Sequence, residues 1–110
     1  MFTIIFPVLN ERLRLESGVT RTVEYLRKIA FEDYEIIIVD NGSEDETPQI
    51  AEMLCQKYET VRYERINVRG VGAAFRRGVE LSHGDVVGYM DIDLSTNCLL
   101  YTSPSPRDYA

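Results

Sequence analysis

The sequence contains few of the residues that support disulfide networks, histidine chemistry or binding to nucleic acid. Its 110 residues include two cysteines, one histidine, and 12 basic against 18 acidic residues, for a net charge of −6. Two cysteines without a partner pattern, Cys55 and Cys98, exclude a disulfide framework and favour a reducing compartment. The acidic balance argues against a protein that coats nucleic acid, because such proteins present a basic face to the phosphates.

Long apolar segments and targeting signals are also missing. No apolar stretch approaches the roughly 20 residues that span a bilayer. The first residues, MFTIIFPVLNER, have no basic region ahead of their short apolar run, unlike a secretory signal peptide. We therefore expect a soluble cytoplasmic chain without a membrane span, which in a full-length protein could lie at the cytoplasmic membrane face. Its length allows one compact domain.

Hydrophobic periodicity predicts strands that alternate with helices. Apolar runs at residues 2–8, 34–40, 61–66 and 85–93 are typical of strands, and the second is apolar at every central position, as in a buried parallel strand. The intervening segments repeat apolar residues at steps of three and four, which predicts helices. The expected core-facing residues of these helices are Leu15, Val19, Val23, Leu26 and Ala30; Ile50, Leu54 and Tyr58; and Val71, Ala74, Phe75 and Val79.

The order of these elements predicts an α/β fold. Thr47 and Pro48 suit the cap and first position of the second helix, and Gly84 suits the end of the third. The third strand has the weakest apolar pattern, which favours a place nearer an edge of the sheet. Alternation of strands and helices indicates a Rossmann-like parallel sheet with flanking helices and right-handed crossovers.

Unusual polar residues fall where the predicted strands end. In open parallel sheets, ligands bind beyond the carboxyl ends of the strands. Asp91 and Asp93 follow the last apolar run, and residues two apart on an extended chain point to the same side. Paired carboxylates of this kind suit Mg²⁺ or Mn²⁺, which shares its coordination shell with substrate phosphates. A solvated acidic loop is the alternative, and the position in the ligand crevice favours the metal.

The other strand ends leave more than one interpretation open. Asp40 could accept hydrogen bonds from a nucleoside, although Asp-Asn-Gly also forms a turn without any ligand. Asn10 and Glu11 could border a ligand or simply start the next helix. Gly70 and Gly72 allow backbone to approach an anion at a helix start. Their spacing is neither a dinucleotide fingerprint nor a Walker P-loop.

Three basic side chains near the third helix also have two interpretations. Arg76 and Arg77 could clamp a phosphate or lie on a solvated helix face, and the second is favoured for one of them. His83 stands beside Gly84, where a capping role is favoured over that of a catalytic base.

The last residues break the pattern. Residues 98–110, CLLYTSPSPRDYA, have two prolines and no amphipathic period, which is typical of an extended or disordered segment. CLLYTSPSPRD also resembles the translation of a sequencing-library adapter, so we expect it to be foreign to the protein. We predict a folded unit in residues 1–97 and a non-native disordered tail in residues 98–110. An uncovered edge and apolar face beside the last strand are then expected.

Four segments together resemble the family 2 glycosyltransferases of the GT-A fold. They are FPVLNE, IIIVDNGSEDET, RGVGAAFRRG and DIDLST, in this order, between residue 2 and about residue 96. The last resembles the D-x-D motif in the form seen among polyprenyl-phosphate hexose transferases. Leu9 replaces the usual aromatic residue of the first segment, and Val71 replaces the common lysine of the third, which removes one expected cationic contact.

The resemblance implies a role for each matching residue. The nucleoside would be bordered by Pro7, Asn10 and Glu11, and Asp40 would hydrogen-bond its base or ribose. The nucleotide pocket would be lined by Gly70 and Gly72, and Asp91 would lie near the ribose and the diphosphate. Asp93, with Asp91, would hold the Mg²⁺ or Mn²⁺ ion. The implied reaction is transfer of a hexose from a UDP- or GDP-sugar, with inversion, to an acceptor such as polyprenyl phosphate.

An inverting transferase also needs a general base, which in this family lies after the D-x-D strand. The sequence offers no candidate for it, so we expect a donor-binding part that is inactive alone. One alternative, a sugar-1-phosphate nucleotidyltransferase, should have a Gly-rich, Arg-containing loop directly after the first strand. The other, a non-catalytic receiver-like module, should have an acidic pair there and a late lysine. Neither pattern is present.

Overall fold

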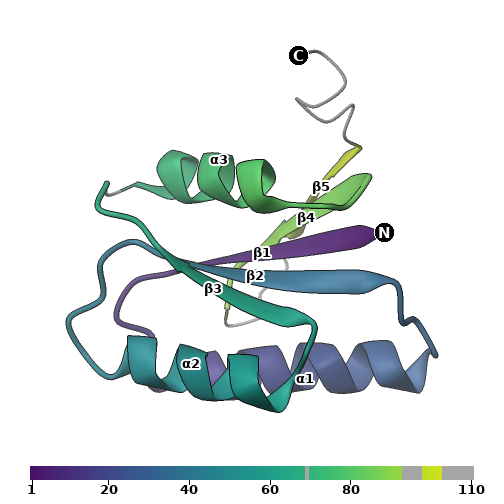
Figure 1. The fold of residues 1–110 in the computed structure, drawn as a ribbon, viewed down its shortest axis with the longest axis horizontal. Helices are drawn as coiled ribbons and strands as arrows, with labels where there is room; N and C mark the ends of the chain where they lie inside the picture. The colour runs from purple at the N-terminus through teal and green to yellow at the C-terminus, as the bar shows by residue number, and fades with distance from the viewer. Residues whose placement is uncertain (69, 93–97, 103–110) are drawn as a thin grey trace.

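The computed structural model describes residues 1–68, 70–92 and 98–102, which form one sheet with helices on both faces (Figure 1). The strands stand in the order β3-β2-β1-β4-β5. They are β1 (Phe2–Val8), β2 (Tyr34–Asp40), β3 (Val61–Arg65), β4 (Val86–Met90) and β5 (Cys98–Thr102). The helices are α1 (Leu15–Lys28), α2 (Thr47–Lys57) and α3 (Val71–Leu81).

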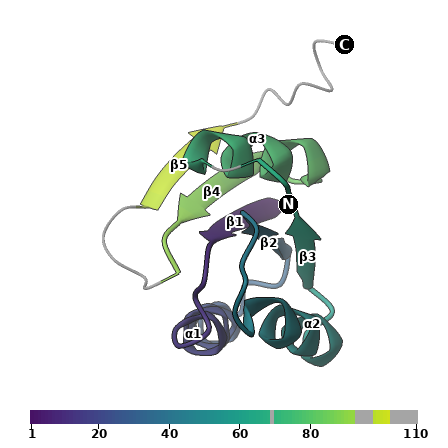
Figure 2. The same cartoon turned by 90° about the vertical axis from the view of Figure 1, so that its left-hand side faces the viewer.

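The sheet has the predicted parallel topology. β1 pairs in parallel with both β2 and β4, and β2 pairs in parallel with β3. β3 lies at an edge, as its weaker apolar pattern predicts. Figure 2 shows α1 and α2 on one face of the sheet and α3 on the other. The α/β prediction is therefore confirmed, and the first four strands form its parallel part.

Strand β2 packs against helices on both faces. Every residue of β2 is buried. Ile36 and Ile38 pack into the core that includes α1 and α2, whereas Ile37 and Val39 pack into the core beneath α3. Full burial of each such side chain stabilises the fold by about 1.5–3 kcal/mol. A central strand covered on both faces needs an unbroken apolar run, which is why this segment does not alternate.

The structure differs from the sequence-based expectation at residues 98–102. This segment forms β5, antiparallel to β4, with Met90 opposite Cys98 and Val86 opposite Thr102. Without β5, the backbone groups along this side of β4 would form an open edge, and a short extended segment satisfies them. Disorder is therefore wrong for these five residues. Residues 103–110 lie outside the described residues, and the foreign origin of the tail stays a prediction.

Helix α1 begins and packs as predicted but ends earlier. Leu15, Val19, Val23 and Leu26 are all buried. The helix ends at Lys28, and Ala30 follows it as an exposed residue with a φ of 57°. A left-handed residue just after the last turn terminates a helix. The predicted place of Ala30 in the core is therefore wrong.

Helix α3 also ends earlier than predicted. Its last residue is Leu81, and Ser82 follows in an extended conformation. Gly84 lies against β1, where an added Cβ would stand 2.4 Å from Thr3 Oγ1. The Gly84 N–H donates to the same hydroxyl at 3.0 Å. The helix stop predicted at Gly84 is wrong, because close packing against β1 requires the glycine there.

A buried carboxylate joins the amino ends of three strands. Glu35 Oε2, on β2, accepts hydrogen bonds from Thr3 Oγ1 at 2.8 Å and from the His83 N–H. Glu35 Oε1 accepts one from Arg62 Nη1, on β3, at 3.2 Å. The Glu35 side chain is only 7% exposed, so these donors replace the water that it loses. His83 thus has a structural role at the edge opposite the predicted ligand crevice.

We predict that Glu35→Gln lowers the free energy of unfolding at neutral pH by about 1–3 kcal/mol, because a buried network loses its ionised acceptor. Burial would raise the pKa of Glu35, but the hydrogen bonds from His83 and Thr3 and the charge of Arg62 lower it below its ordinary 4.5. A lowered pKa stabilises the folded state above pH 4.5, and this contribution declines as the pH falls below that value. Urea unfolding across that range checks both effects.

Glu59→Gln is the control, since Glu59 is exposed. Its unfolding curves should match those of the wild type at each pH. A Glu35→Gln chain with wild-type stability and an unchanged acid profile would contradict the structural role of this carboxylate.

Candidate functional site

The predicted site residues gather at one edge of the sheet. The loops that follow β1, β2 and β3 leave the sheet on the same side, at the left of Figure 1, and Figure 2 looks onto this edge. β4 runs parallel to β1, so Asp91, directly after it, belongs to the same edge. Pro7 lies within β1, paired with Val39 and partly buried. This edge is where ligands bind in open parallel sheets.

The loops after β1 and β2 are joined reciprocally through Asn10. The Asn10 N–H donates to Ser43 Oγ at 2.8 Å, and the Glu44 N–H donates to Asn10 Oδ1 at 2.8 Å. Asn10 has a φ of 53°, a left-handed conformation that asparagine tolerates better than most residues. Its side chain is therefore occupied in joining two loops within the chain.

The next two residues extend this junction. The Glu11 N–H donates to Thr47 Oγ1 at 2.9 Å, and the Arg12 N–H donates to Asp45 Oδ2 at 3.3 Å. Asp45 Oδ1 accepts from the Thr47 N–H at 2.9 Å. Thr47 is already the first residue of α2, whose cap position makes no side-chain hydrogen bond. The predicted capping role of Thr47 is wrong because its hydroxyl serves the loop after β1.

Asp40 organises the loop after β2. It is fully buried, and its Oδ1 accepts from the N–H groups of Gly42 at 3.0 Å and Ser43 at 2.7 Å. Its Oδ2 accepts from the Tyr63 hydroxyl at 2.7 Å. Burial, followed by this hydrogen bond and the negative charge of Asp40, raises the pKa of Tyr63 above its ordinary 10. Asp40 therefore forms the turn that the Asp-Asn-Gly sequence allows without a ligand. Its contact with a nucleoside stays a prediction.

Strand β3 contributes two side chains to this cluster that were not among the predicted site residues. Tyr63 and Arg65 are two apart on β3, and Arg65 Nη1 donates to the Ser43 carbonyl at 3.0 Å and lies 4.0 Å from Asp40 Oδ2. The sequence did contain a signal for this contribution, because Tyr63 and Arg65 have the period-two spacing that places both side chains on one face of β3, and the preceding strand ends in Asp40. This signal identifies no partner until the register of β2 and β3 is known.

The loop after β3 is held to the loop after β2 by Asn41. In the amide orientation that satisfies both its neighbours, Asn41 Nδ2 donates to the carbonyls of Val68 at 3.1 Å and Gly70 at 3.2 Å. Gly70 has a φ of 122°, which side-chain-bearing residues rarely adopt. Neither Gly70 nor Gly72 has an atom within 4 Å of an added Cβ, so both face open space at the start of α3.

Of the two arginines on α3, one is ion-paired within the chain. Arg77 Nη2 lies 2.6 Å from Glu64 Oε2, and its Nη1 lies 3.0 Å from Glu80 Oε2. These interactions raise the pKa of Arg77. Arg76 is exposed. The helix-surface interpretation therefore fits Arg77 better than a phosphate clamp.

Glu11 carries unused acceptor capacity at this edge. Its Oε2 is buried and accepts no hydrogen bond, although Arg14 Nε lies 3.1 Å away at ion-pair distance. The two charges attract each other, but the Nε–H group does not point at the oxygen. A buried carboxylate oxygen without a hydrogen bond is uncommon in folded proteins, and the charge of Arg14 is what offsets it here.

The predicted metal site is only partly described. Asp91 is partly buried at the end of β4, and Ile92 is 4% exposed in the core beneath α1. Asp93 lies outside the described residues, so its pairing with Asp91 stays a prediction. Among the described residues, no group of three or more acidic, histidine or cysteine side chains could hold a metal. The carboxylate of Asp91 has the hard oxygen donors that Mg²⁺ and Mn²⁺ prefer, so it fits such an ion with further ligands from elsewhere.

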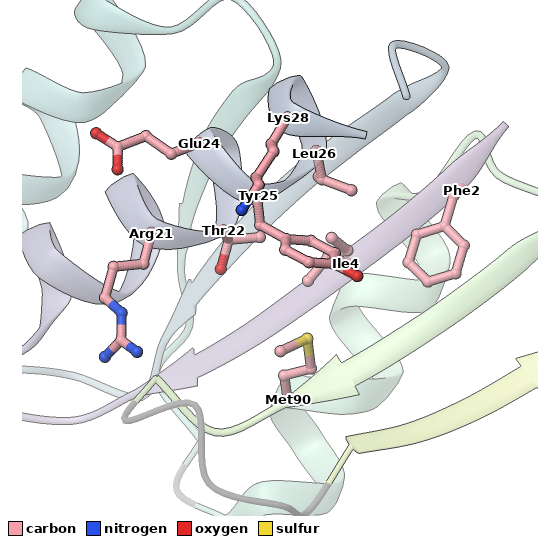
Figure 3. A pocket seen from close by; sticks show the side chains of 9 residues that line it. All are labelled: Phe2, Ile4, Arg21, Thr22, Glu24, Tyr25, Leu26, Lys28 and Met90. Carbon is pink, nitrogen blue, oxygen red and sulfur yellow. The ribbon is translucent and has the colours of Figure 1, made fainter. Parts of the chain in front are cut away.

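A separate hollow lies away from this edge. It has a volume of about 570 Å³ and lies between α1 and the β1–β4 part of the sheet (Figure 3). Phe2, Ile4 and Met90 give it an apolar lining, and Tyr25 from α1 is 62% exposed beside it. It includes none of the predicted site residues. It corresponds to the uncovered apolar face expected beside the last parallel strand.

Solved structures with the same arrangement are glycosyltransferases of the GT-A fold. A mannosyltransferase from Pyrobaculum calidifontis, solved with GDP-Man and Mn²⁺, superposes with a TM-score of 0.72 at 22% identity, over 84% of this chain and 27% of its own. Glucosyl-3-phosphoglycerate synthase from Mycobacterium tuberculosis, solved with Mn²⁺, UDP and phosphoglyceric acid, has a TM-score of 0.64 at 27% identity, over 83% of this chain and 32% of its own. The fold predicted from the sequence is therefore the one observed.

The sequence comparison agrees with the fold. The profile of Glycosyl transferase family 2 matches residues 3–97, and the chain belongs to this family. Dolichyl-phosphate beta-glucosyltransferase from Mus musculus is 37% identical over 101 residues, which cover 86% of this chain and 31% of the relative. Dolichol-phosphate mannosyltransferase from Pyrococcus furiosus is 36% identical over 92 residues, covering 84% of this chain and 25% of the relative. The chain thus spans less than a third of the length of these relatives.

Membership of this transferase family decides against the nucleotidyltransferase and the receiver-like module. Within the residues that the structure describes, no helix combines the length and apolar composition needed to cross a bilayer.

Proposed function

We propose that this chain binds the donor of an inverting hexosyl transfer, a UDP- or GDP-hexose, together with Mg²⁺ or Mn²⁺. The support is the family, the lipid-phosphate transferases among its relatives, and a neighbour at 27% identity that was solved with Mn²⁺ and UDP. The roles of the individual site residues belong to this proposal.

The observation that carries the proposal is the buried Glu11 oxygen, which has the Arg14 guanidinium beside it but no hydrogen bond, among otherwise interlocked loops. Most polar side chains in the loops after β1 and β2 are used up by contacts with one another, as for Asn10 and Asp40. Because these side chains bond to one another, the two loops have few acceptors left for a ligand. The Glu11 carboxylate suits a ribose hydroxyl or a base N–H, because both are donors that an ionised acceptor binds strongly.

The phosphates of the donor would lie between the Gly70–Gly72 turn and Asp91. The open space at both glycines and the amino end of α3 favour an anion there. Asp91 and Asp93 would hold the cation, which when bound offsets the negative charge of the leaving diphosphate. Asp91 then fixes the position of this charge relative to Glu11, on the neighbouring strand end.

We further propose a polyprenyl phosphate as the acceptor, from the dolichyl- and dolichol-phosphate substrates in the names of the relatives. The general base and the acceptor site would lie in the part of these longer proteins that residues 1–97 do not match. The 110-residue chain is then expected to bind the donor without transferring it, and the complete enzyme to work at the cytoplasmic face of a membrane.

Calorimetry with UDP and GDP tests this proposal. We expect one of them to bind in the presence of Mn²⁺ at least about tenfold more tightly than in EDTA, a difference of about 1.4 kcal/mol. Glu11→Gln should weaken binding under both conditions, since its contact with the nucleoside does not involve the cation. Binding that is equal with and without Mn²⁺ would contradict the proposed metal site.

A further inference from the structure

Gly18 is an interior glycine of α1 that helix formation does not require. A glycine within a helix costs about 1 kcal/mol relative to alanine, and one at a buried position usually has a packing reason. An added Cβ at Gly18 would lie 2.3 Å from the Ile92 carbonyl oxygen and 3.0 Å from Ile92 Cδ1. Because the nearest atom belongs to the backbone, a rotamer change cannot relieve this overlap. The chain after β4 therefore runs directly against the backbone of α1.

Ile92 anchors the same segment from the other side of the contact. Its side chain is 4% exposed and belongs to the core that includes Leu15 and Val19 of α1. Two contacts thus hold the backbone at residue 92 in place. One is the buried side chain of Ile92, and the other is the close approach of its carbonyl group to Gly18, which has no Cβ. Asp91 is bonded directly to this anchored residue, so any displacement of Ile92 also displaces Asp91.

Helix α1 also continues directly from the loop that carries Glu11. The Glu11 carbonyl accepts from the N–H groups of Arg14 at 3.0 Å and Leu15 at 2.9 Å, at the start of α1. Gly18 follows one turn later, where its N–H donates to the Arg14 carbonyl at 2.9 Å. One rigid helix therefore connects the loop that carries Glu11 with the segment that carries Asp91.

We propose that Gly18 is a positioning residue that, with Ile92, sets the distance of the Asp91 segment from Glu11 and thereby its capacity to hold a cation on a bound nucleotide. This inference rests on the proposed donor site. A larger side chain at position 18 moves the segment outward, while the loops joined to Asn10 and Asp40 keep their own hydrogen bonds.

Gly18→Ala tests this inference, with Gly78→Ala as the matched control. Gly78 is a buried glycine of α3, where an added Cβ would lie 2.5 Å from Ile5 Cδ1 on the other face of the sheet. Both substitutions add the same methyl group to a crowded helix position, but only the first contacts the segment after β4. Affinities for UDP and GDP are measured with Mn²⁺ and with EDTA, and Mn²⁺ occupancy is followed by electron paramagnetic resonance.

We expect Gly18→Ala to reduce the Mn²⁺-dependent gain in nucleotide affinity by about tenfold or more, as loss of a supporting contact does at metal sites. Affinity in EDTA should stay within about twofold of the wild type. Gly78→Ala should lower the melting temperature and keep the full Mn²⁺-dependent gain. If Gly18→Ala does not fold, Ile92→Ala removes the anchor from the opposite side and should produce the same selective loss.

The possible results distinguish a failure of this inference from a failure of the proposed donor site. A wild-type chain without any Mn²⁺-dependent gain would overturn the proposed metal site and this inference with it. A normal gain in the wild type that survives in Gly18→Ala and in Ile92→Ala would overturn the inference alone. An equal loss of the gain in Gly78→Ala would show a general effect of packing, and would also overturn it.

Discussion

Replacing Asp40 with alanine is expected to lower the free energy of unfolding by about 3–5 kcal/mol, because three buried or half-buried donors lose their common acceptor at once. The N–H groups of Gly42 and Ser43 and the hydroxyl of Tyr63 all donate to this carboxylate. A domain of this size has a total stability of about 5–15 kcal/mol, so the variant should be largely unfolded at modest denaturant concentrations. Urea unfolding followed by circular dichroism measures the change.

Two further variants separate the turn from any contact with a ligand. Asp40→Asn keeps an acceptor oxygen for the backbone N–H groups and should cost about 1–2 kcal/mol. Tyr63→Phe removes one donor, and its effect should not add to that of Asp40→Ala, since the two share one hydrogen bond. Loss of less than about 1 kcal/mol in Asp40→Ala would contradict the organising role of Asp40. A folded Asp40→Asn chain with weakened UDP or GDP binding would in addition support the contact with the nucleoside.

The second large effect concerns Asp91. Asp91→Asn is expected to reduce Mn²⁺-dependent binding of UDP or GDP by about a hundredfold, or about 2.7 kcal/mol, because a neutral amide replaces an ionised ligand of the cation. Binding in EDTA should change little, since the nucleoside contacts come from other strand ends. Calorimetry with and without Mn²⁺ measures both quantities on the same sample.

Asp85→Asn is the control for charge. Asp85 stands just before β4, at its opposite end, with a side chain that is 87% exposed and lies 3.5 Å from the amino group of Met1. The substitution removes one negative charge beside β4, as Asp91→Asn does, but at the opposite edge of the sheet. The role proposed for Asp91 does not survive if both variants keep the full Mn²⁺-dependent gain, or if both lose it equally.

Several parts of the fold follow from local patterns in the sequence. The unbroken apolar run of β2 indicates a strand covered on both faces, and its position in the sheet is as expected. Pro48 stands in the first turn of α2, where its missing N–H has no partner to lose. Polar residues collect after the strands because parallel strands end at one edge. These features depend on neighbours within a few positions, which is why the sequence is enough to predict them.

Other parts depend on residues that are far apart in the chain. Gly84 and Thr3 are separated by 81 positions, and Tyr63 and Asp40 by 23. A glycine followed by a polar segment has the same local appearance whether it ends a helix or fits against a strand. The same holds for Thr47, whose hydroxyl serves the loop after β1 instead of its own helix. For Gly84 and Thr47 the error arose from assigning a nearby partner to a group whose partner is distant.

The sequence by itself determined the class of fold, the edge of the sheet at which the polar loop residues collect and the family, because strand and helix periods and motif order are properties of short segments. Only the tertiary structure decided which polar groups at this edge are hydrogen-bonded within the chain. The oxygens of Asp40 are taken by donors from its own loop and from β3, whereas Glu11 Oε2 is left without a hydrogen bond. It also decided that α1 meets the segment after β4 at Gly18, since steric exclusion acts between atoms that the fold brings together, whatever their distance along the chain.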